Sequence, residues 1–215
     1  MNTTRIIVIA KEPIPGFAKT RLIPALGADA AAALADRLLQ HALSQALAAD
    51  LGPVELCVAP HRDAAYWQQY LQNGNVTLTQ QAEGDLGVRM MRAAEQGLRH
   101  GCPVMLIGTD CPGLNARRLR ALAEALSRHD ACLCPVSDGG YALLGLHQAH
   151  PLLFTDMPWS TPDVARLTRE RLQQLNWRWA ECEPLWDVDE PNDLIRLRAG
   201  YPELAEYPEL AGEPS

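Results

Sequence analysis

Three cationic side chains lie within eleven residues near the start of the chain: Lys11, Lys19 and Arg21. The segment between them holds two prolines and Gly16, which exclude a helix and favour a rigid, exposed loop. The two lysines are the only ones in a 215-residue chain whose formal net charge is −7. Because such a loop presents cations and backbone amides to an anion, it predicts phosphate binding by Lys11, Gly16, Lys19 and Arg21.

Two other interpretations of this loop compete with phosphate binding. A P-loop is excluded, because Pro13 stands where its first glycine is required and Ala18 where the glycine before the lysine is required. A solvated basic loop without a ligand stays open, although three neighbouring cations without an anion repel one another.

Asp110 is a second residue whose position suggests chemistry. It follows an apolar segment, 103–107, that predicts a buried strand. Its carboxylate can either shape a turn or bind a hard cation. Mg²⁺ usually takes one or two protein carboxylates and leaves its other positions to water and substrate phosphate. A strand-end aspartate combined with a cationic loop therefore predicts a site for Mg²⁺ or Mn²⁺.

The second carboxylate of such a site could come from Asp187 or Asp189, for which helix capping is the alternative role. Pro191 at the first position of a short predicted helix makes Glu190 the formal cap, which leaves Asp189 freer. Asp187 and Asp189 both stay open at this point as the second metal ligand, bound directly or through water. The expected catalytic residues are Lys19, Arg21 and Asp110.

Two further motifs predict parts of a site and have simpler structural alternatives. Asp85 and Arg89 lie at the glycine-rich start of a helix that is expected to run to about residue 100, where an anion can bind. The alternative is a tight turn with a surface arginine. Asp138 and His147 are candidates for a general base, although the two glycines after Asp138 equally favour a turn.

Strands and helices alternate along most of the chain, which predicts an α/β fold with a mostly parallel central sheet and helices on both faces. Ligands of such sheets bind beyond the carboxyl ends of the strands, where the cationic loop and Asp110 converge if their strands are neighbours. The expected strands are 5–10, 54–59, 76–79, 103–107, 131–135, 142–146 and 177–180, and the expected helices are 28–49, 63–71, 84–100, 116–128, 162–175 and a short one from 191.

The length and composition favour one domain, residues 1–198, followed by a loosely ordered tail, 199–215, which repeats the motif Tyr-Pro-Glu-Leu-Ala. The negative net charge argues against nucleic acid or an anionic membrane as a partner. No apolar run is long enough for a membrane span, and the first strand begins too early for a signal peptide, so a cytoplasmic location is expected. The sequence does not indicate an oligomeric state.

The positions of the cysteines indicate a structural role rather than a catalytic or metal-binding one. Cys57, Cys102, Cys132 and Cys134 lie in or beside predicted strands, where free cysteine behaves as a small buried hydrophobe. Cys132 and Cys134 should point the same way from one strand, but no second pair completes a zinc site.

Six motifs in one order resemble the bacterial selenodomain-associated transferase family, which has the nucleotide-diphospho-sugar transferase (glycosyltransferase-A, GT-A) fold. The resemblance extends from residue 6 to about residue 198. More distantly, the chain is similar to molybdenum-cofactor and phospholactate nucleotidyltransferases, although it has Lys-Glu-Pro where those enzymes have Gly-Gly before their lysine. The motifs are Lys11–Leu22, Gly84–Arg89, Gly108–Pro112, Asp138–Tyr141, Trp159–Thr161 and Asp187–Leu194.

The resemblance implies an enzyme in which Lys19 and Arg21 bind donor phosphates and Asp110 and Asp189 bind the metal. It also implies an acceptor side formed by Asp138, Tyr141 and Trp159; the alternative for the Trp159 motif is a helix cap with a buried ring.

The expected function is therefore metal-dependent transfer from a nucleotide-activated donor to a small-molecule acceptor. Glycosyl transfer from a nucleoside-diphosphate sugar is the first hypothesis. The alternative is a nucleotidyltransferase that moves a nucleoside monophosphate from a triphosphate to a phosphorylated acceptor and releases pyrophosphate. A non-catalytic nucleotide-binding module comes last, because binding alone does not need two carboxylates beside the cations.

Overall fold

The apolar segment after Thr4 forms the centre of the sheet. The computed structural model describes residues 3–71 and 74–206, and Arg5–Lys11 form its first strand, β1. Ile6, Ile7 and Val8 are completely buried, as expected for β-branched residues in a strand covered on both faces. β1 lies between β2 and β4 and is parallel to both. The two strands that precede the cationic loop and Asp110 are therefore neighbours.

Seven strands form one sheet in the order β3-β2-β1-β4-β6-β5-β7. Only β6 runs antiparallel to its neighbours within the described chain, so the expected mostly parallel sheet is confirmed. The strands are β1 (Arg5–Lys11), β2 (Val54–Ala59), β3 (Val76–Gln80), β4 (Val104–Ile107), β5 (Ala131–Pro135), β6 (Tyr141–Leu146) and β7 (Trp179–Glu181).

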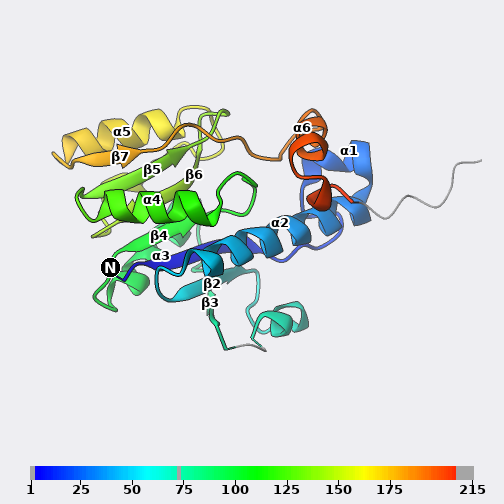
Figure 1. Ribbon diagram of the computed structural model, residues 1–215, viewed down its shortest axis with the longest axis horizontal. Helices are drawn as coiled ribbons and strands as arrows, with labels where there is room; N and C mark the ends of the chain where they lie inside the picture. Colours follow the sequence, from blue (N-terminus) through cyan, green and yellow to red (C-terminus); the bar gives the residue numbers. More distant parts are fainter. Residues whose placement is uncertain (1–2, 72–73, 207–215) are drawn as a thin grey trace, which may run out of the picture.

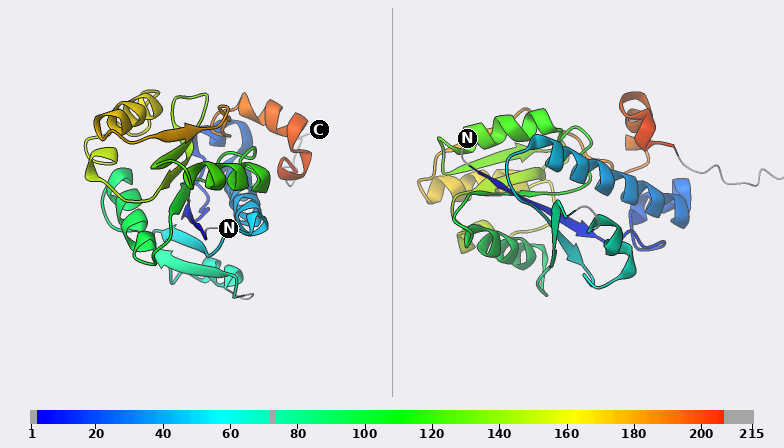
Figure 2. Two further views of the ribbon diagram at one scale, coloured as in Figure 1. Left: turned by 60° about the vertical axis from the view of Figure 1, so that its left-hand side comes forward. Right: turned by 60° about the horizontal axis from the view of Figure 1, so that its bottom comes forward.

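Helices cover both faces of this sheet (Figures 1 and 2). Residues of α2 and α4 belong to the apolar cluster on one face, and residues of α3 and α5 belong to the cluster on the other. The α-helices are α1 (Ile23–Leu26), α2 (Ala28–Ala49), α3 (Leu86–Leu98), α4 (Ala116–Leu126), α5 (Val164–Gln174) and α6 (Asp193–Gly200). The 3-10 helices are η1 (Thr20–Leu22), η2 (Ala65–Tyr70), η3 (Pro151–Leu153) and η4 (Pro202–Leu204).

A helical extension, formed by η1, α1, the first half of α2, α6 and η4, lies beyond the carboxyl end of β1. In Figure 1 α1 and α6 lie side by side at the end of the molecule toward which β1 runs. The extension has its own apolar cluster, in which Leu22, Leu34, Leu38 and Leu197 are buried. It thereby joins the start of the chain to its end, and places η1 next to the segment that follows β7.

The expected elements agree with the structure to within about two residues, and one of them differs in type. The segment 63–71 forms the 3-10 helix η2 rather than an α-helix. Trp67 is buried there, and the hydroxyls of Tyr66 and Tyr70 bond to the Asp36 carboxylate on α2, so tertiary contacts hold a segment too short for a stable helix. α5 and α6 begin two residues after Pro162 and Pro191 respectively, because each proline lies in the turn before the helix.

The expected loose tail is wrong for its first copy of the repeat. Leu204 in η4 is buried in the cluster of the extension, and Tyr201 and Ala205 pack against it. The aromatic and aliphatic residues of the repeat supply the contacts that hold it. The second copy lies outside the described residues. No helix in the described chain is both long and apolar enough to cross a membrane.

Candidate active site

Lys19 is the centre of the polar contacts at the carboxyl end of β1. Its backbone has a φ of +47°, in the left-handed region that residues other than glycine rarely adopt. The side chain is 6 % exposed, and Nζ lies 2.6 Å from Oδ1 of Asp110 and donates to the carbonyl oxygen of Val188 at 2.5 Å. One lysine therefore contacts the residues that follow β4 and the segment that follows β7. Such a sparsely populated backbone conformation, held by tertiary contacts, is typical of functional sites.

Arg21 and Asp189 form a second, more exposed ion pair between the same two segments. Their Nη1 and Oδ2 atoms are 2.5 Å apart, and the Arg21 side chain is 61 % exposed. The carboxylate of Asp193 accepts the backbone amides of Asp189 and Glu190, so it is Asp193 that stabilises this turn. Asp189 is thus free of capping, as predicted, but its carboxylate is directed to Arg21.

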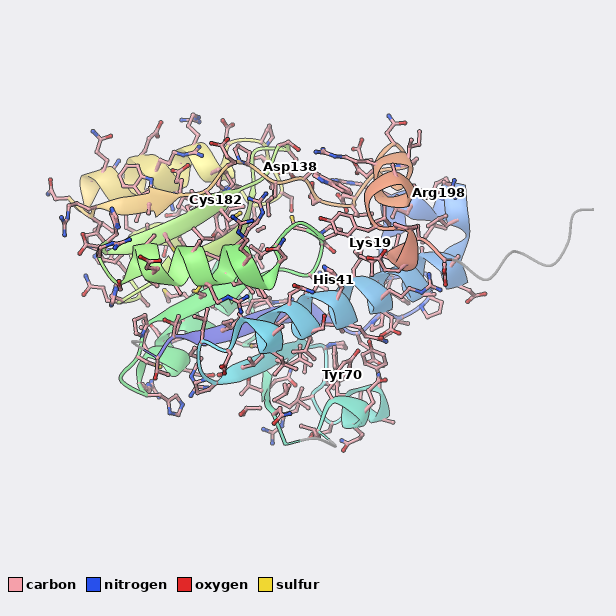
Figure 3. The ribbon with its side chains drawn as sticks, viewed as in Figure 1. Lys19, His41, Tyr70, Asp138, Cys182 and Arg198 are labelled. Carbon is pink, nitrogen blue, oxygen red and sulfur yellow. The ribbon has the colours of Figure 1, made fainter. Side chains whose placement is uncertain are left out.

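A cavity of about 150 Å³ opens at the carboxyl ends of β4 and β5. Three carboxylates line it, those of Asp110, Asp138 and Asp187, together with Gly108, Cys111, Val136, Gly140, Tyr141 and Ala142. The backbone amide of Val188 donates to the carbonyl of Asp110 at 2.9 Å, which holds the segment after β7 against the end of β4. Figure 3 shows Lys19 beside the helical extension and Asp138 on the loop between β5 and β6.

The carboxylates of this cavity carry an excess of negative charge. Partial burial, followed by the repulsion of Asp138, Asp110 and Asp189, raises the pKa of Asp187 to about 6. Lys19 is directed to Asp110 and does not compensate all three acids. Oxygen ligands with uncompensated negative charge suit a divalent cation, so the residues present fit Mg²⁺ or Mn²⁺. No group of three or more potential metal ligands is preassembled in residues 3–71 and 74–206.

Asp187, rather than the predicted Asp189, therefore shares the cavity with Asp110. The sequence had already offered both aspartates, and the choice of Asp189 depended on the capping argument and on the family resemblance. The isolated bridge between Val136 and Leu185 continues the β5–β7 pairing and aligns the segment before Asp187 with the cavity. The Trp-Asp-Val-Asp motif contains no signal for that pairing.

Asp85 and Arg89, predicted to contact phosphate, form the cap of α3. Oδ1 of Asp85 accepts the amide of Val88 at 2.9 Å, and Nε of Arg89 donates to the carbonyl of Gly84 at 2.9 Å. Neither residue lines the cavity. Lys11 at the end of β1 and Gly16, with a φ of +83°, belong to the exposed loop before Lys19.

Of the three predicted acceptor residues, Asp138 and Tyr141 line the cavity and Trp159 packs against Tyr141. Asp138 accepts the amide of Gly140 at 2.8 Å, so it shapes a turn and also lines the cavity. Tyr141 lines it too, and its ring meets that of Trp159 edge-on at 6.4 Å. The Tyr141 hydroxyl and the Trp159 Nε1 are buried without a hydrogen-bond partner among the described residues, and burial raises the pKa of Tyr141.

His147, the other general-base candidate, lies at the opposite end of the sheet. β6 is antiparallel, so the residue after it lies near the start of β4. The His147 Nε2 is 2.8 Å from the carbonyl oxygen of Leu126. That contact gives His147 a structural role and removes it from the list of candidates.

Comparisons with known proteins agree with this architecture. A sequence profile of a family described as uncharacterized proteins conserved in bacteria, DUF2064, matches residues 26–161, more than half of the chain. A candidate nucleotide-diphospho-sugar transferase from Desulfovibrio desulfuricans G20 is 28 % identical, with a TM-score of 0.81 over 94 % of this chain and 90 % of that one. A search of curated proteins found no match.

Two more distant solved structures share the fold. CMP:2-keto-3-deoxy-manno-octonic acid synthetase, solved with CTP, is 12 % identical, with a TM-score of 0.56 over 94 % of this chain and 99 % of that one. A nucleotidyl transferase from Methanothermobacter is 15 % identical, with a TM-score of 0.57 over 94 % and 99 %. The predicted nucleotide-diphospho-sugar transferase fold is therefore confirmed.

Proposed function

The chain belongs to the DUF2064 family, and from that premise we propose that it is a metal-dependent transferase that acts on a nucleotide-activated donor. The reaction we favour is transfer of a glycosyl group from a nucleoside-diphosphate sugar to a small-molecule acceptor. The likeness to the Desulfovibrio protein supports this choice, because it combines 28 % identity with nearly complete coverage of both chains.

The observation that carries the proposal is the meeting of cations and carboxylates at neighbouring strand ends. Lys19 and Arg21 follow β1, whereas Asp110 follows β4, and Asp187 reaches the same cavity from the segment after β7. β1 and β4 are the neighbouring strands at which the strand order of the sheet reverses. In open α/β sheets, ligands bind at the carboxyl ends of such strands. A nucleoside diphosphate needs both positive charge for its phosphates and a metal between them and any carboxylate.

Each residue then has a role that its position allows. Asp110 and Asp187 would hold the Mg²⁺ or Mn²⁺ ion, and Asp189 orients Arg21. The bound ion supplies positive charge that offsets the charge developing on the diphosphate leaving group. Lys19 and Arg21 bind donor phosphate oxygens after they release their carboxylate partners. The loop residues Lys11 and Gly16 contribute further contacts, whereas Asp85 and Arg89 shape the start of α3.

The acceptor side is formed by Asp138, Tyr141 and Trp159 in this proposal. Asp138 lines the cavity and accepts the amide of Gly140, and its carboxylate can take a proton from an acceptor hydroxyl. Tyr141 forms part of the wall of the same cavity, and the ring of Trp159 packs edge-on against it.

Nucleotidyl transfer is the second candidate, and the nucleotidyltransferases among the structural neighbours favour it. Their identity of 12–15 % supports the fold alone, which places this reaction behind glycosyl transfer. Both reactions use the same stabilisation of phosphate charge, so the leaving group is what distinguishes them. Glycosyl transfer releases a nucleoside diphosphate, whereas nucleotidyl transfer releases pyrophosphate.

The test is a thermal-shift panel of nucleoside di- and triphosphates and nucleotide sugars, each with and without Mn²⁺, followed by product analysis. A ligand at 100 times its Kd stabilises the folded protein by roughly 2.7 kcal/mol. We expect stabilisation by nucleotide sugars only with metal, and release of nucleoside diphosphate once an acceptor is present. Metal-independent binding, or binding without turnover of any donor, would contradict the proposal.

A further inference from the structure

Cys134 and Cys182 bring two thiols into contact on neighbouring strands. Cys134 lies in β5, and Cys182 directly follows β7, which pairs with β5 in parallel register. The amide of Cys182 donates to the carbonyl of Leu133 at 3.3 Å, which continues that register by one residue. The two Sγ atoms are 2.8 Å apart, the only thiol pair in hydrogen-bond contact within the described chain. The sequence did not predict this pair, because 47 residues separate its members.

The geometry of adjacent strands permits a disulfide at this position. Neighbouring strands lie about 4.8 Å apart, and disulfides join Cα atoms at roughly 4.4–6.8 Å. A sulfur–sulfur bond of about 2.0 Å would require the two Sγ atoms to approach by only about 0.8 Å from their present contact. The backbone can therefore keep its β5–β7 pairing when the bond forms.

The two thiols differ in exposure and in acidity. Cys182 is partly exposed, whereas Cys134 is completely buried. The hydrogen bond with Cys134, and then the charge of Arg118, lower the pKa of Cys182 below its usual value. The same hydrogen bond, and then burial, raise the pKa of Cys134. Cys182 is therefore the thiol that ionises first, and the Cys134 thiol can then donate its hydrogen to the Cys182 thiolate.

We propose that Cys182 and Cys134 are a redox-modification site, at which a peroxide oxidises Cys182 and Cys134 resolves the product as a disulfide. The Cys182 thiolate attacks one peroxide oxygen and becomes a sulfenic acid, and the other oxygen leaves and is protonated to water. The Cys134 sulfur then attacks the Cys182 sulfur and displaces the hydroxyl group, which takes up the Cys134 proton and leaves as water. Two thiols and one hydrogen peroxide yield one disulfide and two waters. The step is independent of the proposed transferase activity.

The disulfide would fasten the segment that carries Asp187 to β5. Three residues after Cys182, Leu185 donates its amide to the carbonyl of Pro135 and accepts the amide of Ser137, each at 2.9 Å. Asp187 lies two residues further along, in the wall of the cavity. A covalent link at the start of this short segment removes the openings in which it separates from β5. The oxidised protein therefore exchanges the amide protons of 182–188 more slowly.

The experiment treats the reduced full-length protein with one equivalent of hydrogen peroxide and measures intact mass, disulfide-linked peptides and amide hydrogen exchange. We expect a loss of 2 Da, a Cys134–Cys182 peptide, reversal by dithiothreitol and at least about threefold slower exchange in 182–188. In Cys134→Ser we expect a sulfenic acid at Cys182 that dimedone traps, and in Cys182→Ser no rapid oxidation. Cys102→Ser is the matched control, because Cys102 is also partly exposed but precedes β4 at the opposite end of the sheet; it should behave as the unmodified protein does.

Three results would overturn the proposal. One is oxidation that reaches Cys102 as fast as Cys182. Another is a Cys182→Ser protein that still loses 2 Da at the original rate. The third is a disulfide that forms but leaves exchange in 182–188 unchanged, which would remove the clamping effect. Serine is close to cysteine in size, and a melting temperature of each variant within about 3 °C of the unmodified protein confirms that the comparison is between folded proteins.

Discussion

The two ends of the parallel strands contain ionisable groups in opposite arrangements. At the amino end, Arg5 of β1 and Glu55 of β2 are nearly buried and form one ion pair at 3.4 Å. Thr79 of β3 donates its hydroxyl to the same glutamate at 2.7 Å. At the carboxyl end, Asp110, Asp138 and Asp187 share a cavity into which Lys19 brings one cation. The first arrangement is balanced within the protein, whereas the second is not.

This difference separates a structural role from a functional one. A buried pair such as Arg5–Glu55 needs no ligand, because each charge is compensated by the other. An uncompensated carboxylate cluster at the surface raises a pKa, as for Asp187, and its charge is relieved by a cation. Substitutions at the amino end should therefore change stability, and those at the carboxyl end should change ligand binding.

The largest effect on stability is expected for Glu55→Ala. The substitution leaves the Arg5 guanidinium nearly buried without its carboxylate, and its Nε already lacks a partner in the described chain. Removal of one member of a buried pair costs about 3–5 kcal/mol. Urea unfolding measures the loss, and Glu95→Ala, which breaks the exposed pair with Arg92, is the control expected to change stability by less than about 0.5 kcal/mol. Equal losses in the two variants would contradict the distinction between the pairs.

The largest effect on binding is expected for Asp110→Asn. The variant should lose metal-dependent nucleotide binding by at least about tenfold, roughly 1.4 kcal/mol, because an amide is a poorer ligand for a hard cation. The stability of the metal-free protein should stay nearly the same, since the loss of the Lys19 ion pair and the relief of repulsion among three neighbouring acids oppose each other. Calorimetric titration with nucleotide and Mn²⁺ measures the change.

The same titration tests which late aspartate binds the metal. Asp187→Asn should reproduce the effect of Asp110→Asn, whereas Asp189→Asn should keep its dependence on metal, because that carboxylate contacts Arg21. A crystal with donor and Mn²⁺ gives the direct answer. An ion more than about 4 Å from both Asp110 and Asp187, beyond the roughly 2.0–2.6 Å of direct ligation, would show that the assigned site is wrong.

The sequence predicted the parts of this molecule that depend on local patterns. Apolar runs of β-branched residues gave the buried strands, and α2 and β5 occur at the expected residues. The sequence also predicted that Asp110 lies at the carboxyl end of β4. The residues that follow parallel strands all lie at the same edge of the sheet, where the strands end.

The sequence could not predict contacts that depend on pairing between distant segments. The pairing of β5 with β7 decides that Asp187, not Asp189, reaches the cavity, and it also brings Cys182 to Cys134. The same holds for η2, where Asp36 on α2 holds two tyrosines by hydrogen bonds. Local propensity contains no information about these partners.

Arg21→Ala should have a smaller effect on binding and almost none on stability. The ion pair with Asp189 is exposed and contributes little to folding, so we expect a change within about 0.5 kcal/mol. Loss of one exposed phosphate contact should weaken nucleotide binding by about fivefold, or ~1 kcal/mol. Arg62→Ala, which removes another exposed arginine that contacts an aspartate, is the matched control and should bind normally. Unchanged nucleotide affinity in folded Arg21→Ala protein would remove Arg21 from the phosphate site.

The smallest effect, and the most direct measure of the charge excess, is the pH dependence of metal-free Asp187→Asn. In the folded protein the pKa of Asp187 is raised from 3.8 to about 6. Between these values the folded state holds a proton that the unfolded state has lost. Asp187 therefore favours folding at the acid end of this range, and its contribution decreases as the pH rises through about 6.

Asparagine cannot ionise, so the variant lacks this decrease. Relative to the unmodified protein it should gain stability between pH 4.5 and 7 by less than about 1 kcal/mol, because the half-exposed side chain is screened by solvent. Urea unfolding in EDTA at four pH values measures the difference, and Asp63→Asn, which removes an exposed acid outside the cavity, is the control. Other acidic groups titrate in both proteins and cancel in the comparison. If the free energies of unfolding of the two proteins differ by the same amount at every pH from 4.5 to 7, the cavity holds no excess charge. The contrast between the two ends of the sheet would then disappear.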